Sequence, residues 1–161
     1  GNPEEGELRP QLQDRFGLSV DVRTPSDVPT RVEIIRSREA FDKDRGAFRK
    51  RWARKESTLR RRIQRAREAL DSVDTPANLL ETAAKLCIAL GTDGLRGELT
   101  LVRSARALAA LNSDSTATLE HLKTIAPSVL RHRLRRDPLD ESSADIRVER
   151  VIAELFNDCD D

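Results

Sequence analysis

The stretch "LGTDGLRGELTLVRSARALAAL", residues 90–111, predicts a helix that begins directly after a glycine-punctuated turn. Gly91 suits the C-terminal cap of a preceding helix, and Gly94 and Gly97 would let the backbone approach a ligand closely. Arg96 stands between these two glycines. Because the free N–H groups of a helix start attract anions and a guanidinium matches phosphate geometry, Arg96 is a candidate phosphate contact. The simpler alternative is an ordinary loop-to-helix turn with a solvated arginine.

Helical periodicity extends on both sides of this stretch. Before it, Thr75 and Pro76 suit a helix start. The apolar stripe behind this start has helical spacing: Leu79, Leu80, Ala83, Leu86, Cys87 and Leu90. Similar patterns predict further helices after Asp27, around 59–70, over about 118–135 and over 143–156. Pro127 should kink or split the helix that contains it. The chain is therefore expected to be mainly α-helical.

Residues 17–25, "GLSVDVRTP", are the only good strand candidate. Three apolar residues alternate there with polar neighbours: Leu18, Val20 and Val22. This is the period of a strand with one buried face. One strand followed by five or six helices predicts that residues 1–25 are the end of an α/β core and that residues 26–161 form a helical bundle.

The composition fits one domain-sized chain without a global charge preference. The 161 residues are 37% hydrophobic, which can supply a core, and the formal net charge is +1. Charge is nevertheless segregated, with fifteen Lys or Arg between Arg31 and Arg67. Arg60, Arg61 and Arg62 could contact nucleic acid, but the nearby aromatic residues form no stacking platform of the usual kind. Nucleic acid is therefore not an expected partner, and the basic segment is either a solvated face or a docking surface for a partner subunit.

The sulfur and imidazole groups indicate neither a metal site nor a disulfide framework. Cys87 and Cys159 are far apart, and no C-x-x-C motif or histidine at ligand spacing occurs. His132 is expected to be structural, because no nucleophile or metal partner stands near it in the sequence. No apolar run approaches the roughly 20 residues of a membrane span, so we expect a soluble protein in a reducing compartment. The chain begins at "GNPEEGELRP" without Met, which favours a C-terminal piece of a longer protein.

Three collinear segments resemble one protein family. They are "NPEEGELRPQLQDRFGLSV" at 2–20, the stretch at 90–111, and "IAPSVLRHRLRRDPLDE" at 125–141. Each is similar to a segment of the AAA+ ATPase subunit of magnesium chelatase, the chelatase I subunit. The resemblance implies that residues 1–25 end an AAA+ α/β core with sensor 1 and the arginine finger, and that residues 26–161 are a helical lid domain with sensor 2.

The resemblance also implies roles for single residues. Asn2 matches the sensor 1 asparagine, which orients the attacking water or contacts the γ-phosphate. Arg15 matches the arginine finger, which acts in trans on ATP of the adjacent subunit, and Asp14 matches the acid beside it at the subunit interface. Arg96 matches the sensor 2 arginine, which contacts the ATP phosphates from the lid. Gln13 departs from the usual leucine, and the Walker A and B segments are missing, so this chain alone is not expected to hydrolyse ATP.

The resemblance implies a motor function within a larger complex. A hexameric ring of such subunits would couple ATP hydrolysis to insertion of Mg²⁺ into protoporphyrin IX, toward chlorophyll or bacteriochlorophyll. ATP and Mg²⁺ would be bound mainly by the missing N-terminal part. The implied partners are like subunits, a second AAA+ subunit and a large porphyrin-binding subunit, in the bacterial cytoplasm or, less favoured, the plastid stroma. The alternatives are a related metal-chelatase ATPase with another target and a non-catalytic helical interaction module.

Overall fold

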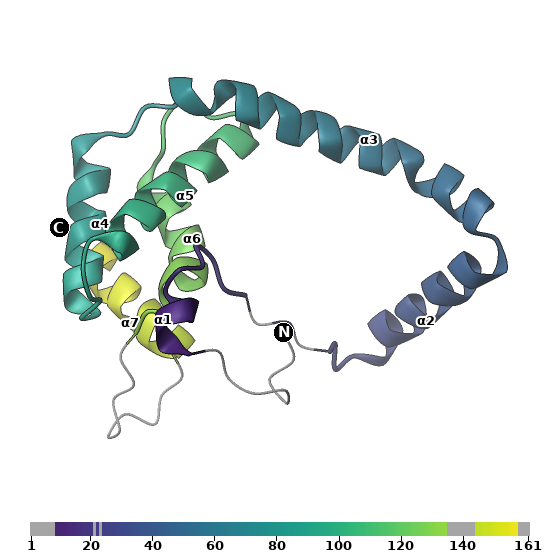
Figure 1. Cartoon of the computed structure of the whole chain (residues 1–161), viewed down its shortest axis with the longest axis horizontal. Helices are drawn as coiled ribbons and strands as arrows, with labels where there is room; N and C mark the ends of the chain where they lie inside the picture. The colour runs from purple at the N-terminus through teal and green to yellow at the C-terminus, as the bar shows by residue number, and fades with distance from the viewer. Residues whose placement is uncertain (1–8, 21, 23, 135–143, 158–161) are drawn as a thin grey trace. The chain divides into compact units, whose positions relative to one another are not determined.

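The computed structural model describes residues 9–20, 22, 24–134 and 144–157 of the chain. These residues are mainly helical, as predicted (Figure 1). They form two compact units, one made by the described residues up to Val20 together with those from Ala66 onwards, and one made by those in between. The elements in chain order are α1 (Pro10–Gln13), α2 (Val28–Lys43), α3 (Arg45–Ala69), a 3₁₀ turn (Leu70–Ser72), α4 (Ala77–Ala89), α5 (Arg96–Asn112), α6 (Leu119–Leu130) and α7 (Ala144–Asn157).

The first unit is a bundle of α4, α5, α6 and α7 (Figure 1). Its largest fully buried side chains are Leu79, Leu86 and Cys87 of α4, Leu101 of α5, Leu122, Val129 and Leu130 of α6, and Val148 of α7. Burying one such side chain stabilises the fold by about 1.5–3 kcal/mol relative to leaving it exposed. The stripe predicted for α4 is confirmed except at Leu80, which is 48% exposed. The apolar stripes therefore hold the four helices together.

Close packing of small residues joins α5 to α4. Gly97 is buried in the first turn of α5, and a Cβ atom there would lie 3.3 Å from Cys87 Sγ and 3.4 Å from Thr92 Oγ1. Gly97 therefore makes room for α4 and its C-terminal loop, and not for a ligand as the sequence suggested. Gly91 caps α4 as predicted, with a φ of 65° that disfavours other residues. Together these glycines fix where α5 begins.

The link between α5 and α6 is closed by hydrogen bonds around His121. The backbone N–H of Thr118 donates to His121 Nδ1 over 3.1 Å, and His121 Nε2 lies 3.0 Å from Asp114 Oδ2. Asp74, from the loop before α4, pairs with this link through an isolated parallel bridge to Thr116. His121 is buried and serves as the helix-capping side chain, so it holds a structural position.

Helix α6 runs through Pro127 without a break. Of the two outcomes predicted for Pro127, a kink or a split, the split does not occur. Proline lacks the N–H of one helical hydrogen bond, but burial of Ala126, Val129 and Leu130 on either side of it stabilises the helical path. The helix ends at Leu130, and a turn follows over residues 131–134.

The predicted strand over residues 17–25 is not formed by the described residues. Residues 18–20, 22 and 24 are irregular, and Leu18, Val20 and Val22 are all at least half exposed. Period-two alternation predicts a strand only where a neighbouring strand completes the hydrogen-bond ladder, and the described part of the chain offers none. The Ser19 N–H instead donates to the Ser128 carbonyl over 2.8 Å, which attaches this segment to α6.

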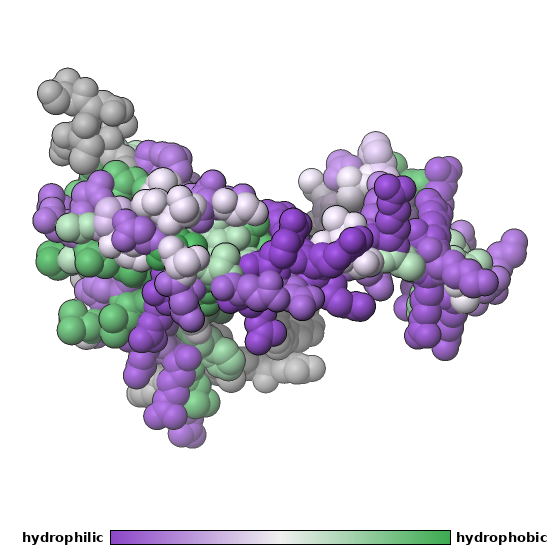
Figure 2. Space-filling view, turned by 90° about the horizontal axis from the view of Figure 1, so that it is seen from above, coloured by the Kyte–Doolittle hydropathy of each residue, from purple (hydrophilic) through white to green (hydrophobic). Residues whose placement is uncertain are grey.

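The second unit is the helical pair of α2 and α3. Asp27 caps α2 by accepting a 2.8 Å hydrogen bond from the Thr30 N–H, and bonding to Thr30 lowers the pKa of this carboxyl. Rings of Phe41, Phe48 and Trp52 meet where the two helices join, with centroids 5.5 and 6.0 Å apart. The basic segment of the sequence lies here, and Figure 2 shows hydrophilic side chains over much of this unit. Within the described ranges, no helix is long and apolar enough to cross a membrane.

Replacing Gly97 by valine should loosen the bundle where α5 meets α4. The added carbons would press on Cys87 and Thr92, so we expect the free energy of unfolding to fall by about 1–3 kcal/mol. Ala107→Val, on the exposed side of the same helix, should cost less than about 1 kcal/mol. Urea unfolding followed by circular dichroism measures both, and equal losses would contradict the proposed close packing at Gly97.

Candidate functional site

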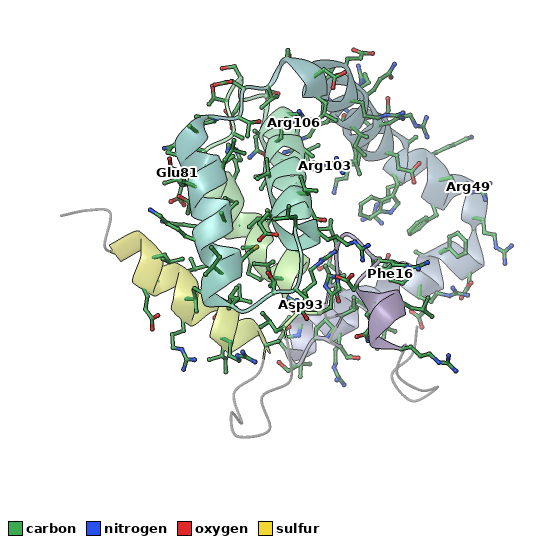
Figure 3. All side chains as sticks on the ribbon, turned by 60° about the vertical axis from the view of Figure 1, so that its left-hand side comes forward. Phe16, Arg49, Glu81, Asp93, Arg103 and Arg106 are labelled. Atoms are coloured by element: carbon green, nitrogen blue, oxygen red, sulfur yellow. The ribbon has the colours of Figure 1, made fainter. Side chains whose placement is uncertain are left out.

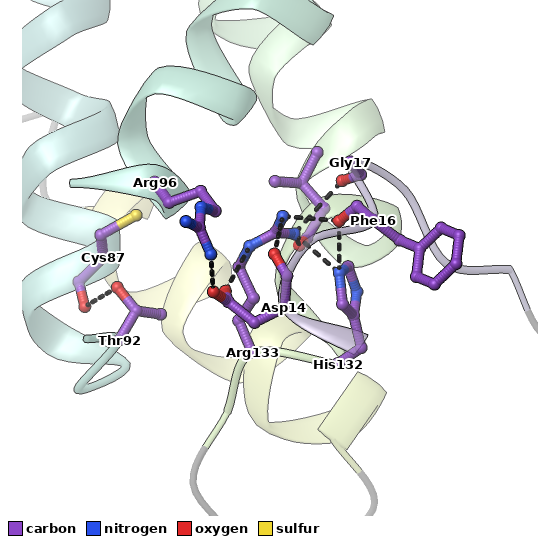
Figure 4. A network of polar contacts seen from close by, with 9 residues as sticks. Asp14, Phe16, Gly17, Cys87, Thr92, Arg96, His132 and Arg133 are labelled. Carbon is purple, nitrogen blue, oxygen red and sulfur yellow. Dashed lines mark hydrogen bonds and ion pairs between the residues drawn. The ribbon is translucent and has the colours of Figure 1, made fainter. Parts of the chain in front are cut away.

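The candidate site forms where the turn after α1 meets the start of α5 and the end of α6 (Figure 4). The Asp14 carboxylate lies between two arginines. Its Oδ2 pairs with Arg96 Nη1, and its Oδ1 lies 3.5 Å from Arg133 Nε. The site therefore joins three segments that are far apart in the sequence through one acid.

Arg133 is the buried member of this cluster. Its side chain is 3% exposed, whereas those of Asp14 and Arg96 are 40% and 54% exposed. Its Nη2 donates to the carbonyl oxygens of Phe16 over 2.7 Å and of Asp14 over 3.3 Å. Its Nη1 donates to the Gly17 carbonyl over 3.2 Å and also to the Val129 carbonyl at the end of α6. Burial lowers the pKa of Arg133, and the Asp14 carboxylate opposes that effect.

His132 completes the contacts to the same turn. Its Nε2 lies 3.0 Å from the Phe16 carbonyl and 2.8 Å from Arg133 Nη1. Burial is the largest influence on His132 and lowers its pKa, because the imidazolium form loses hydration. The described residues contain no group of three or more His, Cys, Asp or Glu side chains that could hold a metal ion. The position of His132 against a backbone carbonyl fits the structural role expected from the sequence.

Arg96 is the first residue of α5, and its side chain is about half exposed to solvent. The residue before it, Leu95, offers no side-chain cap to the helix, so the first-turn N–H groups have no side-chain acceptor from that position. Gly94 precedes it in the left-handed region, with a φ of 68°. An exposed guanidinium beside an uncapped helix start is suited to an anion such as a phosphate group. The residues present therefore fit a nucleotide phosphate at this position.

Arg15 lies in the same turn but outside the ion-pair cluster. It is exposed, and its backbone N–H donates to the Leu12 carbonyl over 3.1 Å. The structure thus brings Asp14 and Arg96 into contact and leaves Arg15 at the surface beside them. Asn2 lies outside the described residues.

Arg133 belongs to this site, although it was not predicted from the sequence. It follows Ala126 by seven residues and Val129 by four, so it continues the spacing of the buried stripe of α6 into the turn after Leu130. An arginine at a core position of an apolar stripe needs a charged or polar partner. That signal was present in "IAPSVLRHRLRR", although it does not reveal which partner Arg133 contacts.

A separate hollow lies along α4 and α5. It measures about 520 Å³ and is lined by Thr75, Leu80, Glu98, Leu99, Val102, Arg103 and Arg106. Figure 3 shows Arg103 and Arg106 on α5. None of the residues expected to contact nucleotide lines this hollow, so it is distinct from the cluster around Asp14.

Comparison with known proteins gives this geometry a family context. Residues 80–154 match the AAA lid domain family. The chain is 59% identical over 157 residues to the magnesium-chelatase 38 kDa subunit of Acidiphilium rubrum, covering 98% of this chain and 46% of that protein. Over nearly its whole length the chain is similar to this magnesium-chelatase subunit. The AAA lid domain match includes Arg96 and Arg133, and Asp14 lies outside it.

Other magnesium-chelatase subunits are similar to the chain over nearly the same span. The 38 kDa subunit of Rhodobacter capsulatus is 57% identical over 97% of this chain and 45% of its own length. The chloroplastic magnesium-chelatase subunit ChlI of Oryza sativa is 44% identical over 97% of this chain and 38% of its own length. The chain thus spans about half the length, or less, of the curated relatives it matches.

A solved structure supports the fold. The crystal structure of a candidate ATPase from Cytophaga hutchinsonii superposes with a TM-score of 0.68 at 16% sequence identity, covering 92% of this chain and 48% of that one. At this identity the likeness concerns the fold alone. It agrees with the helical bundle expected of an AAA lid.

Asp14→Asn should destabilise the bundle more than loss of an ordinary surface carboxylate. Arg133 would stay buried without its negative partner, so we expect the free energy of unfolding to fall by about 1–3 kcal/mol. Glu120→Gln removes an exposed pair with Lys123 and should cost less than about 1 kcal/mol. Chemical denaturation measures the free energy of unfolding of both variants. If Asp14→Asn loses no more stability than Glu120→Gln, Arg133 does not depend on the acid.

The depressed pKa of His132 predicts a pH effect on stability. The folded state favours neutral imidazole, so the unfolded state binds more protons as the pH falls through the ordinary value of about 6.5. The His132 contribution to stability is present above that pH and is lost below it. We therefore expect His132→Gln to gain stability relative to the unaltered protein between pH 7 and pH 5. Thermal melts across this range measure the difference, and parallel curves would contradict it.

Proposed function

We propose that this chain is the nucleotide-responsive part of a magnesium-chelatase ATPase subunit. In this proposal a hexameric AAA+ ring of such subunits couples ATP hydrolysis to insertion of Mg²⁺ into protoporphyrin IX, in chlorophyll or bacteriochlorophyll synthesis. Residues 1–25 would end the nucleotide-binding core, and residues 26–161 would form the lid domain. The observation that carries the proposal is the similarity to magnesium-chelatase 38 kDa subunits over nearly the whole chain.

The geometry of the Asp14 cluster supports a role in phosphate sensing. Arg96 presents an exposed guanidinium at an uncapped helix start, which suits contact with ATP of its own subunit as sensor 2. Arg15 stands on the surface next to Asp14, where it can reach ATP of an adjacent subunit as the arginine finger. Phosphoryl transfer is catalysed mainly by positioning and charge stabilisation, and both arginines supply positive charge. Asn2 would act as sensor 1, and Asp14 would lie at the interface between subunits.

The cofactor of this proposal is ATP with Mg²⁺, held mainly by other parts of the subunit. Bound ATP would supply the phosphoryl group whose transfer to water releases free energy. Within this chain, Arg96 would bind phosphate oxygens, and Arg15 would neutralise charge that develops during transfer in the neighbouring site. The Mg²⁺ that enters the porphyrin is the substrate of the complex and is separate from the ion that accompanies ATP.

The proposed partners are like subunits, the second AAA+ chelatase subunit and a large subunit that holds the porphyrin. The basic helices α2 and α3 offer a surface for such contacts, because few of their side chains are covered within the described structure. A bacterial cytoplasm is the favoured location. The 38 kDa subunits of Acidiphilium rubrum and Rhodobacter capsulatus share more identity with the chain than the chloroplastic subunit of Oryza sativa does.

Arg15→Ala in a full-length subunit tests the finger assignment. Rings mixed from unaltered and Arg15→Ala subunits should lose ATPase activity in proportion to the variant fraction, because each variant withholds a charge from its neighbour. An arginine finger is worth about 10³–10⁵ in rate. Because Arg15 is exposed, its removal should leave folding intact. Arg9→Ala, an exposed arginine at the start of the same segment, is the control and should leave activity unchanged.

The outcomes separate the proposed functions. Unchanged ATPase activity in the Arg15→Ala mixtures would remove the finger assignment and favour an interaction module that acts through α2 and α3. A second outcome would point to a related chelatase. In that case the Arg15→Ala mixtures lose ATPase activity, but the unaltered complete complex inserts another metal such as Co²⁺, and not Mg²⁺, into protoporphyrin. Porphyrin fluorescence reports both metals.

A further inference from the structure

The buried guanidinium of Arg133 holds the backbone on both sides of Arg15. The Asp14 carbonyl belongs to the peptide group that leads into Arg15, and it accepts from Nη2 over 3.3 Å. The Phe16 carbonyl follows Arg15 and accepts from the same nitrogen over 2.7 Å. The Gly17 carbonyl accepts from Nη1 over 3.2 Å. One side chain therefore binds three backbone carbonyls of the same turn, one before and two after the exposed Arg15 (Figure 4).

These contacts are stronger than their number suggests. A guanidinium presents five N–H donors in a rigid plane, so one group can satisfy several carbonyls and a carboxylate at once. Hydrogen bonds from a charged donor are roughly twice as strong as neutral ones. The side chain of Arg133 is 3% exposed, so water competes little for these donors. The turn is consequently fixed to the end of α6 even though it contributes no strand to a sheet.

We propose that Arg133 is the positioning residue for Arg15. By binding the Asp14 carbonyl before Arg15 and the Phe16 and Gly17 carbonyls after it, Arg133 sets the point and direction from which the finger leaves the surface. This inference rests on the proposed function of Arg15 and adds a residue that acts through it. Arg133 itself contacts no nucleotide in this proposal, because its Nη1 and Nη2 donate to the Gly17 and Phe16 carbonyls and its Nε lies 3.5 Å from the Asp14 carboxylate.

Asp14 extends this arrangement to the start of α5. The same carboxylate that lies beside Arg133 pairs with Arg96. The finger is therefore anchored to the lid of its own subunit, while the site that it serves belongs to the neighbour. A change in the lid that shifts the end of α6 would move the finger with it.

Arg133→Lys in the full-length subunit is the first test. Lysine keeps the buried positive charge but cannot bind the three carbonyls in one plane. We expect kcat for ATP to fall by about 10- to 100-fold, as for a misplaced catalytic group, with KM for ATP unchanged. Arg131→Lys is the matched control, because the Arg131 Nε donates to the Pro127 carbonyl of α6 and not to residues 14–17. It should leave kcat unchanged.

Two further comparisons show whether Arg133 acts through Arg15. In an Arg15→Ala background, Arg133→Lys should cause no additional loss, because the group that it positions is gone. In mixed rings, Arg133→Lys subunits should lower hydrolysis by unaltered neighbours, as Arg15→Ala subunits do. An additional loss in the Arg15→Ala background, or a raised KM with unchanged kcat, would overturn the proposal.

A measurement independent of activity covers the case in which Arg133→Lys lowers stability. A spin label attached to Arg15→Cys in a Cys159→Ser background reports the mobility of this turn. Cys87 should remain unlabelled, because it is fully buried and burial raises its pKa to about 11. We expect greater label mobility with Arg133→Lys and no change with Arg131→Lys, and equal mobility in all three proteins would overturn the proposal. If Arg15→Ala alone leaves ATPase activity intact, the finger assignment fails first; if it abolishes activity while Arg133→Lys changes neither kcat nor mobility, only the positioning inference fails.

Discussion

The structure around the candidate site depends on one buried charge, the guanidinium of Arg133. A cation removed from water must find compensating partners, and Arg133 finds them in the Asp14 carboxylate and in carbonyls of Phe16 and Gly17. This requirement ties a segment with little regular structure to the helical bundle. Neither the short helix α1 nor the exposed apolar residues after it could hold that position alone. The need to satisfy Arg133 therefore explains why residues 14–17 have a defined place.

The second constraint is the close approach of α4 and α5. Gly97 allows the first turn of α5 to lie against Cys87 and Thr92, and the small residues Ala105 and Ala109 are buried further along the same helix. The position of Arg96 follows from this packing, because it is the residue immediately before Gly97. A side chain at the very start of a helix is exposed to solvent, while the helix behind it is rigidly packed. Packing and exposure together place the half-exposed guanidinium of Arg96 at the start of a well-packed helix.

The sequence predicted the helices well because their signal is local. The spacing of Leu79, Leu86 and Cys87 is a property of one segment, and core burial followed from it. The strand over residues 17–25 failed because a strand also needs a partner, which a single segment cannot reveal. The family resemblance identified Asp14 and Arg96, yet no pattern along the chain showed that they would meet. Arg133 was missed for the same reason, since its contacts with residues 14–17 span more than a hundred positions.

The unequal burial of the two arginines determines how the Asp14 cluster can respond to an anion. Arg133 is almost fully buried, so losing its carboxylate would leave a desolvated charge. Arg96 is about half exposed, so water can replace the carboxylate at little cost. If Arg96 acts as the proposed sensor, Asp14 would therefore remain with Arg133 when Arg96 turns toward a phosphate group. In the proposed mechanism, sensing at Arg96 can occur without releasing the turn that carries Arg15, and the sensor exchanges partners while the finger stays anchored.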